Sequence, residues 1–360
     1  MTEIIWDNEH YRELTKSWNQ AMCSRFESVF SNLHKMEAIT ESDLSERVYK
    51  YSLDLMKGWY KEPSPTAGLS NAEFIAQIND LNELIRLAAT MSVYGDMIVP
   101  DLVIKGLMEF GVDSMDAMVR EIMRVDFEAA GKIPDVDETD YFSAFTILPG
   151  APPEDKVTIL DYDLTGEKRG LTAEEIDCAE EIDYSECESQ APQRVAASFL
   201  NLISNHSAAV YIPLIVEKFA ATNNPDIYIQ EALAHYLTEA GQKSPDWMMS
   251  WLTNTIENRE DLRAHPVIYL VMSGIASAHH SGNTSNALAL LIRSLEYMKN
   301  KADGVSCLAI LGDQRAIPFL RAWLQNHQNQ MDEETWHEFT AAIRNLGGKV
   351  DPADHPSRFH

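Results

Sequence analysis

The chain has 360 residues, 45% of them hydrophobic, and a formal net charge of −27 at pH 7. This length and composition suffice for one or two domains with a sizeable core. The charge argues against binding to nucleic acid or to an anionic membrane, because both need lysine and arginine on the protein. It favours a basic protein as the partner, since opposite charges speed encounter at low salt.

Neither a secretory signal nor a membrane span is predicted. The first residues, MTEIIWDNEHYREL, carry acids and lack an apolar core, and no run of about 18 apolar residues follows. The cysteines are too few and too scattered for a disulfide framework: Cys23, Cys178, Cys187 and Cys307. We therefore expect a cytoplasmic protein.

Residues 1–133 are predicted to form an N-terminal helical region, because apolar residues recur there with the period of a helical face. Helices are expected at Trp6–Phe30, Leu44–Trp59, Asn71–Met91, Val99–Phe110 and Ser114–Ala130. Ser70 and Glu73 have the spacing of a capping box for the third helix. Pro100 suits the first turn of the fourth, where a missing N–H costs nothing.

Residues 134–190 are the most acidic part of the chain. They hold 17 acidic and 3 basic residues, which gives −14 of the net −27. Prolines and glycines interrupt helices, and KVTILDYD followed by TGEKRG is typical of a strand and a turn. Thr172 then suits an N-cap, with Glu175 at the capping-box position. The sequence predicts an acidic irregular insert that is compatible with a small β-hairpin.

The stretch DYDLTGEKRGLT in this insert matches a calcium loop only in part. Loop positions 1, 3, 5 and 6 are occupied by Asp161, Asp163, Thr165 and Gly166. Lys168 stands at the usually apolar position 8, and Thr172 stands at position 12, where a bidentate Glu is required. The strand-like segment before the loop also replaces the helix that the motif needs. The pattern therefore favours a hairpin turn over a metal site.

Helical patterns return at residue 191 and continue to 348, with short turns between them. In LAILGDQRAIPFLRAWL, Gly312 suits the left-handed end of one helix and Asp313 suits the cap of the next. A broad apolar stripe follows, made of Ala316, Ile317, Phe319, Leu320, Trp323 and Leu324. The next segment, DEETWHEFTAAIRNLGG, repeats this order, with Asp332 as the cap and Gly347 as the stop.

This order of helix caps, apolar stripes and glycine stops resembles the HEAT-type helical repeat of α-solenoids. The resemblance is good over residues 303–348 and weaker over 191–302. The resemblance implies a stack of helix pairs with an interaction surface, and it brings no catalytic residue. A divergent helical bundle is the alternative. The expected fold is mostly α. Its parts are a helical region (1–133), the acidic insert (134–190), a HEAT-like array (191–348) and a C-terminal tail (349–360).

No catalytic, cofactor or metal site is predicted. The chain lacks HExxH, CxxC, GxSxG, GxxxxGK[ST] and GxGxxG patterns, and its 11 histidines are mostly isolated. Cys178 and Cys187 lie among acids, which raise a thiol pKa and disfavour a thiolate nucleophile. Paired carboxylates such as Glu174 and Glu175 could serve acid–base chemistry only in a cleft that separates their pKa values.

The sequence favours a non-catalytic protein that binds and neutralises a basic partner. An immunity or antitoxin protein that covers a cationic toxin, such as a nuclease, would need this combination of charge and helical frame. The expected partner-binding acids are Asp161, Asp163, Glu167, Glu174, Glu175, Asp177, Glu180, Glu181 and Asp183. Trp247 and Trp323 are candidate apolar anchors, because tryptophan is enriched at interface hot spots; a helix core is the other interpretation of Trp247. A scaffold that uses the concave face of the array, and an enzyme with an unfamiliar site, are alternatives.

Overall fold

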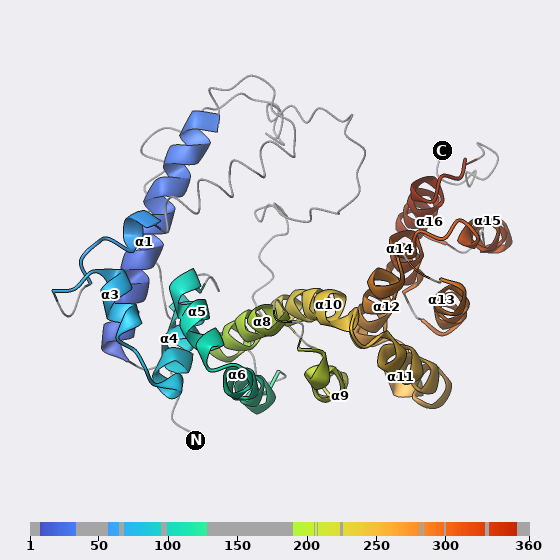
Figure 1. Ribbon diagram of the computed structural model, residues 1–360. Helices are drawn as coiled ribbons and strands as arrows, with labels where there is room; N and C mark the ends of the chain where they lie inside the picture. The colour runs from blue at the N-terminus through green and yellow to red at the C-terminus, as the bar shows by residue number, and fades with distance from the viewer. Residues whose placement is uncertain are drawn as a thin grey trace. The chain divides into compact units, whose positions relative to one another are not determined.

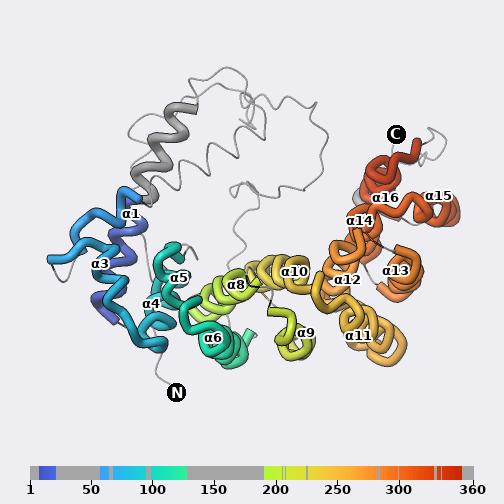
Figure 2. Tube along the Cα trace, in the orientation of Figure 1, coloured from blue at the N-terminus to red at the C-terminus, as the bar shows by residue number. Residues whose placement is uncertain are grey.

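The computed structural model describes residues 8–33, 57–64, 68–94, 99–127, 190–204, 206, 208–223, 226–280, 282, 284–298, 300–327 and 331–350. Most of these residues are helical, and their only β pairing is an isolated bridge between Pro63 and Ser70 (Figures 1 and 2). The mostly α prediction is therefore confirmed. The acidic insert, except for Gln190, lies outside the described residues, as do the hairpin and the helix expected after Thr172.

The chain divides into two compact units, and the division falls inside one helix, between Ser114 and Met115. The first unit contains α1 (Glu9–Leu33), α3 (Asn71–Ala76), α4 (Leu81–Tyr94) and α5 (Asp101–Glu109). In that unit α1 packs on α4, and α5 packs on both α3 and α4. No helix in the described part of the chain is both long and apolar enough to cross a bilayer.

The core of the first unit is built around α1. Its buried side chains include Tyr11, Leu14 and Trp18, which follow the predicted helical period. Trp18 meets Trp59 edge to face at a centroid distance of 4.8 Å, a favourable aromatic geometry. The indole of Trp59 also donates a hydrogen bond to Ser17 Oγ at 3.0 Å, so its only polar atom is satisfied on burial.

The long helix predicted from Asn71 to Met91 is wrong, because the structure has two helices there. The capping box of Ser70 and Glu73 is present and starts α3, as expected. The chain then leaves the helix, and Asp80 accepts the Glu83 N–H at 3.1 Å to start α4. An aspartate competes well for backbone N–H groups, so this one begins a new helix where apolar periodicity alone suggested a continuous one.

Two further boundaries differ from the expectation. Pro100 stands just before α5, in an extended conformation, and not inside its first turn. The helix expected at 114–130 is α6 (Val112–Arg124), which begins directly after Gly111. Gly111 has φ of 57°, a left-handed conformation that suits the end of the preceding helix.

The second unit contains most of α6 and, apart from Ala191 at the start of α8, the later helices of the described residues. These are α8 (Ala191–Ser204), η1 (Ala209–Tyr211), α9 (Ile212–Ala220), α10 (Ile227–Gly241), α11 (Pro245–Asn258), η2 (Glu260–Leu262), α12 (Pro266–His279), α13 (Ser285–Tyr297), α14 (Lys301–Leu311), α15 (Ala316–His327) and α16 (Glu333–Asn345). From α9 onward they form successive antiparallel pairs joined by short turns.

The pairs stack into two layers. In the inner layer α10 packs on α12, α12 on α14, and α14 on α16; in the outer layer α11 packs on α13, and α13 on α15. We assign α9 to the outer layer because it packs on α10 and α12. Figure 1 shows the inner layer along the inside of the bend of α9–α16 and the outer layer along its outside. Each helix thus buries its apolar side against its pair and its stacked neighbours.

Close approach between neighbouring helices, both between the layers and within the inner layer, depends on small residues. A Cβ atom at Gly304 of α14 would overlap Leu295 of α13 and Met298 after it. At Gly274 of α12, a Cβ would lie 3.1 Å from Leu237 of α10. Glycine has a low helix propensity, but at these two positions it allows the helices to pack closely.

The last two helices confirm most of the helix caps, stops and buried positions predicted from the sequence. Gly312 and Gly347 have φ of 74° and 81°, and Asp332 accepts the Thr335 N–H at 2.7 Å. The buried face of α16 is the expected one: Trp336, Phe339, Ile343 and Leu346. In α15 the predicted stripe is only partly buried, through Ala316, Leu320 and Leu324.

The role expected for Asp313 is wrong in detail. The helix starts at Ala316, three residues later, and the Asp313 carboxylate accepts the Arg315 N–H at 3.0 Å in the turn before it. An aspartate in such a turn commonly bonds the backbone two residues on.

Candidate functional site

The nine acids expected to bind a partner, between Asp161 and Asp183, lie outside the described residues. The two predicted tryptophan anchors are described, and both belong to the outer layer. Trp247 is on α11 and Trp323 is on α15. Each is half-buried, and each already has aromatic partners within the array.

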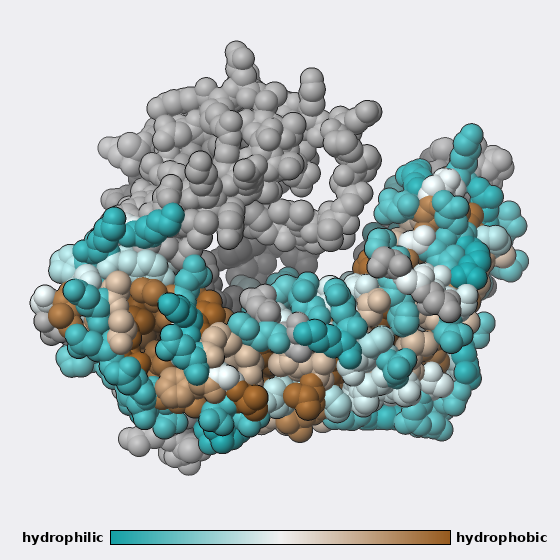
Figure 3. Space-filling model, viewed as in Figure 1, coloured by the Kyte–Doolittle hydropathy of each residue, from teal (hydrophilic) through white to brown (hydrophobic). Residues whose placement is uncertain are grey.

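Trp247 stacks on Trp251, with ring centroids 6.3 Å apart. Trp251 is buried, and its indole N–H donates to Glu217 Oε1 of α9 at 2.6 Å. The pair therefore fastens α11 to α9, and Trp247 covers the edge of that contact. Nearby on η1 and α9, Val210 and Leu214 are 78% and 48% exposed. Figure 3 shows hydrophobic residues over the region of α6 and α9.

Trp323 is held between two rings. It stacks on Phe339 of α16 at 4.1 Å and on His327 of its own helix at 4.2 Å. Phe339 is 1% exposed, so Trp323 covers a core residue and joins the last helix pair. These contacts indicate packing as the main role of Trp323.

The inner layer presents a face of a different kind. On α10 the exposed residues that lie opposite the core include Glu231, His235 and Glu239, at i, i+4 and i+8. Helix α12 contains no aspartate, glutamate, lysine or arginine, and its least buried side chains include Tyr269 and Ser277. We call the side of α10, α12, α14 and α16 that points away from the outer layer the inner face.

Tyr269 marks where three inner helices meet. Its half-buried side chain has Ser306 of α14 as a hydrogen-bond partner, and Asp303 of α14 and Glu338 of α16 act on it electrostatically. Burial raises the pKa of the Tyr269 phenol, and the nearby Cys307, Asp303 and Glu338 raise that pKa further. The phenol thus remains a neutral hydrogen-bonding group within a negative field.

Charge is distributed differently over the two layers. By sequence, the inner-layer helices contain six acidic and two basic residues, or −4, whereas the outer-layer helices contain four and three, or −1. Across the described residues, none forms an ion pair with Glu231, Glu239 or Glu338. All three carboxylates are exposed to solvent.

Two outer-layer carboxylates form ion pairs with arginines. Arg293 of α13 pairs with Glu257 of α11 at 2.6 Å, and Arg259 reaches Glu217 of α9 at 3.4 Å. Lys301 is on an inner helix, but its ammonium donates to the carbonyl oxygens of Leu295 and Glu296, the latter at 3.1 Å. Cations at a helix C-terminus interact favourably with its dipole. Lys301 therefore stabilises the end of α13.

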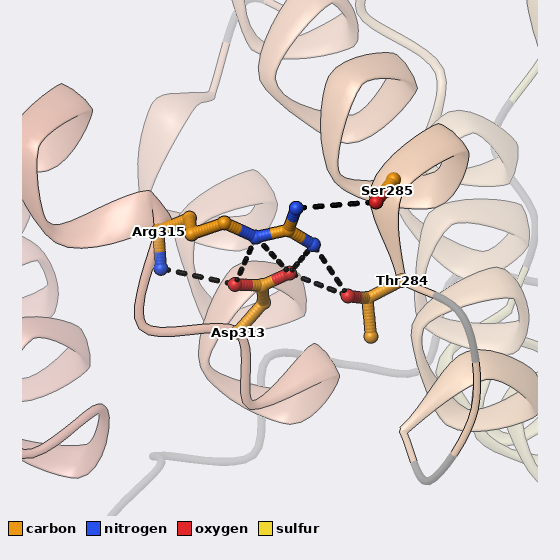
Figure 4. A network of polar contacts seen from close by, with 4 residues as sticks. All are labelled: Thr284, Ser285, Asp313 and Arg315. Carbon is orange, nitrogen blue, oxygen red and sulfur yellow. Dashed lines mark hydrogen bonds and ion pairs between the residues drawn. The ribbon is translucent and has the colours of Figure 1, made fainter.

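A polar network ties two successive turns together on one side of the array. Asp313 accepts hydrogen bonds from the Thr284 hydroxyl at 2.5 Å and from Arg315 Nη2 at 2.5 Å, and Arg315 Nη1 donates to Ser285 at 3.1 Å (Figure 4). The Arg315 guanidinium, with help from Thr284, holds the pKa of the Asp313 carboxyl well below its usual range. The network links the turn before α13 to the turn before α15 and so stiffens the stack.

Two histidines and a cysteine of the described residues make contacts within the fold. In the part of the chain that the structure describes, no three His, Cys, Asp or Glu side chains gather where they could hold a metal ion. His265 caps α12 by accepting the Val267 N–H at 3.1 Å and contacts Thr222 O, while His280 contacts Ile310 O at 2.6 Å. Cys307 is buried, and burial raises the pKa of its thiol.

Comparisons of the chain with family models, with curated proteins and with solved structures find no match.

The inner-face residues were not predicted from the sequence, although part of their pattern is visible in it. The i, i+4 spacing of Glu231, His235 and Glu239 marks one side of a helix, and helix α12 is the longest charge-free one in the array. Neither pattern says which side of the array a residue faces. That requires the pairing of helices into layers, which the structure supplies.

Proposed function

We propose that this protein is a non-catalytic binding protein that neutralises a basic protein partner. The supporting observation is the inner face, where Glu231, Glu239 and Glu338 are exposed without a cationic partner among the described residues. A toxin that binds phosphate must present lysine and arginine. An acidic surface of this kind is what an immunity or antitoxin protein against a cationic nuclease would need. The proposed setting is the cytoplasm.

Charge and a rigid helical frame would affect both the association rate and the lifetime of the complex. A net charge of −27 attracts a basic protein over long distances, which raises the association rate at low salt. The stacked helix pairs hold the backbone of these acids in place, so little backbone freedom is lost when a partner binds. The acids of residues 134–190, which carry −14, would add to this attraction.

The direct test uses a small cationic ribonuclease as the probe. We expect its affinity for the full chain to fall steeply as salt rises from about 50 to about 300 mM, because exposed charges are screened over a Debye length of about 8–10 Å in this range. Inhibition of the ribonuclease should fall in parallel. An affinity that does not change with salt would contradict the proposal.

A scaffold that assembles protein complexes is the second candidate, and the two stacked layers of α9–α16 favour it. It rests on the proposed HEAT-like character of the array, since solenoid repeats commonly offer an extended surface. Deletion of residues 154–188 separates the candidates. A charge-driven inhibitor should lose much of its affinity for the partner, whereas a scaffold that binds through the helices alone should keep it.

A further inference from the structure

Helix α12 begins with a histidine cap, whereas its neighbour α14 begins with an asparagine cap. His265 Nδ1 accepts the Val267 N–H at 3.1 Å, and Asn300 Oδ1 accepts the Ala302 N–H at 3.1 Å in the same way. Both caps satisfy a backbone N–H that has no partner inside its helix. Histidine changes its charge between about pH 5 and 8, and asparagine does not. Only the cap of α12 therefore depends on a proton.

The partners of the His265 ring determine which nitrogen carries the proton. Nε2 contacts the carbonyl oxygen of Thr222, in the turn after α9, and a carbonyl oxygen can only accept a hydrogen bond. Nε2 must therefore carry hydrogen, and Nδ1, which accepts the Val267 N–H, must not. Phe219 of α9 packs edge to face on the ring, with centroids 5.6 Å apart. The neutral ring thus satisfies both partners in one orientation.

We infer that His265 forms a pH-sensitive contact, in which the neutral ring joins the turn after α9 to the start of α12 and protonation separates them. A proton on Nδ1 would point at the Val267 N–H, and two donors cannot share a hydrogen bond. The ring would have to turn away, and it would then lose Thr222 O as well. A positive charge at a helix N-terminus is also opposed by the helix dipole.

The charged groups around the start of α12 do not offset this loss. Among the ion pairs of the described residues, none includes His265. The charged side chains of η2, of α9 and of the first turns of α10 and α14 have other contacts: Arg259 with Glu217 and Asp261, Arg263 with Glu260, Lys218 with Phe127, Asp226 with the Tyr228 N–H, Lys301 with carbonyls of α13, and Asp303 with Tyr269.

The two ends of α12 should respond to acid in opposite ways. At the C-terminal end, His280 Nδ1 contacts Ile310 O of α14 at 2.6 Å, and this carbonyl can accept from either a neutral or a protonated ring. A positive charge near the C-termini of α12 and α14 is favoured by their dipoles. Acid therefore loosens the start of α12 and leaves its end in place. This response does not depend on the identity of the partner, so it goes beyond the proposed function.

Hydrogen exchange of the full wild-type chain tests the inference with an internal control. Protection of the first turn of α12 should fall about fivefold from about pH 7.5 to about pH 5, after correction for the intrinsic effect of pH on exchange. The first turn of α14, with the Asn300 cap, should change less than about twofold. Equal changes at the two helix starts would overturn the inference.

Matched variants assign the pH response to His265. Between the same two pH values, the folding equilibrium constant of the wild type should fall about fivefold more than that of His265→Asn, which keeps an acceptor and cannot titrate. His337→Asn removes an exposed histidine of α16 that lies 3.6 Å from Glu333, and should retain the wild-type loss. An equal loss in His265→Asn and the wild type would contradict the inference.

A measurement on the wild type decides the matter if His265→Asn does not fold. The nitrogen chemical shifts of the His265 ring at about pH 7.5 report which nitrogen carries the proton. We expect hydrogen on Nε2 and none on Nδ1. Hydrogen on Nδ1 at this pH would show that the ring does not accept the Val267 N–H, and the inference would fail.

Discussion

The inner and outer layers of the helical array use the same kind of helix, but they differ in which of their acids have arginine partners among the described residues. On the outer side, Glu217 and Glu257 have arginine partners on neighbouring elements. On the inner side, Glu231, Glu239 and Glu338 are exposed and have no such partner in the described part of the chain. Acids that stabilise the fold have partners within it. Acids without partners repel one another and do not stabilise the fold. Their position is therefore a better guide to a binding surface than the position of the paired acids.

The largest expected effect on stability comes from the packing between the inner and outer layers. Phe339→Ala should lower the free energy of unfolding by about 3–5 kcal/mol, because it removes a fully buried ring that stacks on Trp323 and joins α16 to α15. Chemical denaturation measures the loss. Phe319→Ala, at a half-buried position of α15, is the control and should cost clearly less. Equal losses would show that α15 and α16 are not packed as described.

The polar network should contribute next. Asp313→Asn should lower the free energy of unfolding by about 1–3 kcal/mol, because the carboxylate is buried and bonded to Arg315 and Thr284. Thermal unfolding near neutral pH checks this value. Asp246→Asn, an exposed acid of the outer layer, removes the same charge without the network and should cost less.

The same carboxyl gives a pH dependence with a definite sign. Its pKa is lower in the folded chain than the ordinary value of about 3.9, so its contribution to stability is complete above that value. The contribution disappears as pH falls from about 4 through the lower folded pKa. Asp313→Asn should therefore lose stability less steeply than the wild type below about pH 4. Parallel acid unfolding curves for the two proteins would contradict this assignment.

The cap of α12 offers a smaller effect. His265→Ala removes the acceptor for the Val267 N–H and the contact with Thr222 O, and should cost about 1–2 kcal/mol. His265→Asn keeps a side-chain acceptor at the cap and should recover part of that loss. Denaturant titration of both variants measures it, and identical losses would assign the effect to the Thr222 contact alone.

The smallest expected effect addresses the comparison of the two faces directly. Glu257→Gln breaks the pair with Arg293 and should cost about 0.2–1 kcal/mol, with less effect at high salt. Glu231→Gln breaks no ion pair with another described residue and should leave stability within about 0.5 kcal/mol or raise it slightly. Denaturation at low and high salt compares the two. A larger loss for Glu231→Gln would show that this acid is structural.

Local chemistry explains which parts of the fold could be predicted from the sequence. The capping box at Ser70, the cap at Asp332 and the stops at Gly312 and Gly347 depend on neighbouring residues only, and the structure confirms them. The break before α4 was missed because apolar periodicity continues across Asp80, whose carboxylate nevertheless starts a new helix.

The candidate site was less predictable, because it depends on contacts between distant segments. Tyr269, Asp303 and Glu338 come together only through the stacking of α12, α14 and α16. The same stacking places Trp247 and Trp323 in the outer layer. The acids between Asp161 and Asp183 lie outside the described residues, so their proposed role remains a prediction.

The most direct test compares three full-length chains with one cationic ribonuclease at about 50 mM salt. They are the wild type, the inner-face variant Glu231→Gln/Glu239→Gln and the outer-layer variant Asp246→Asn/Glu296→Gln. Loss of two exposed ion pairs should weaken the inner-face complex about fivefold to tenfold, while the outer-layer complex stays within about twofold of the wild type. Equal affinities for the two variants would contradict the assignment of binding to the inner face.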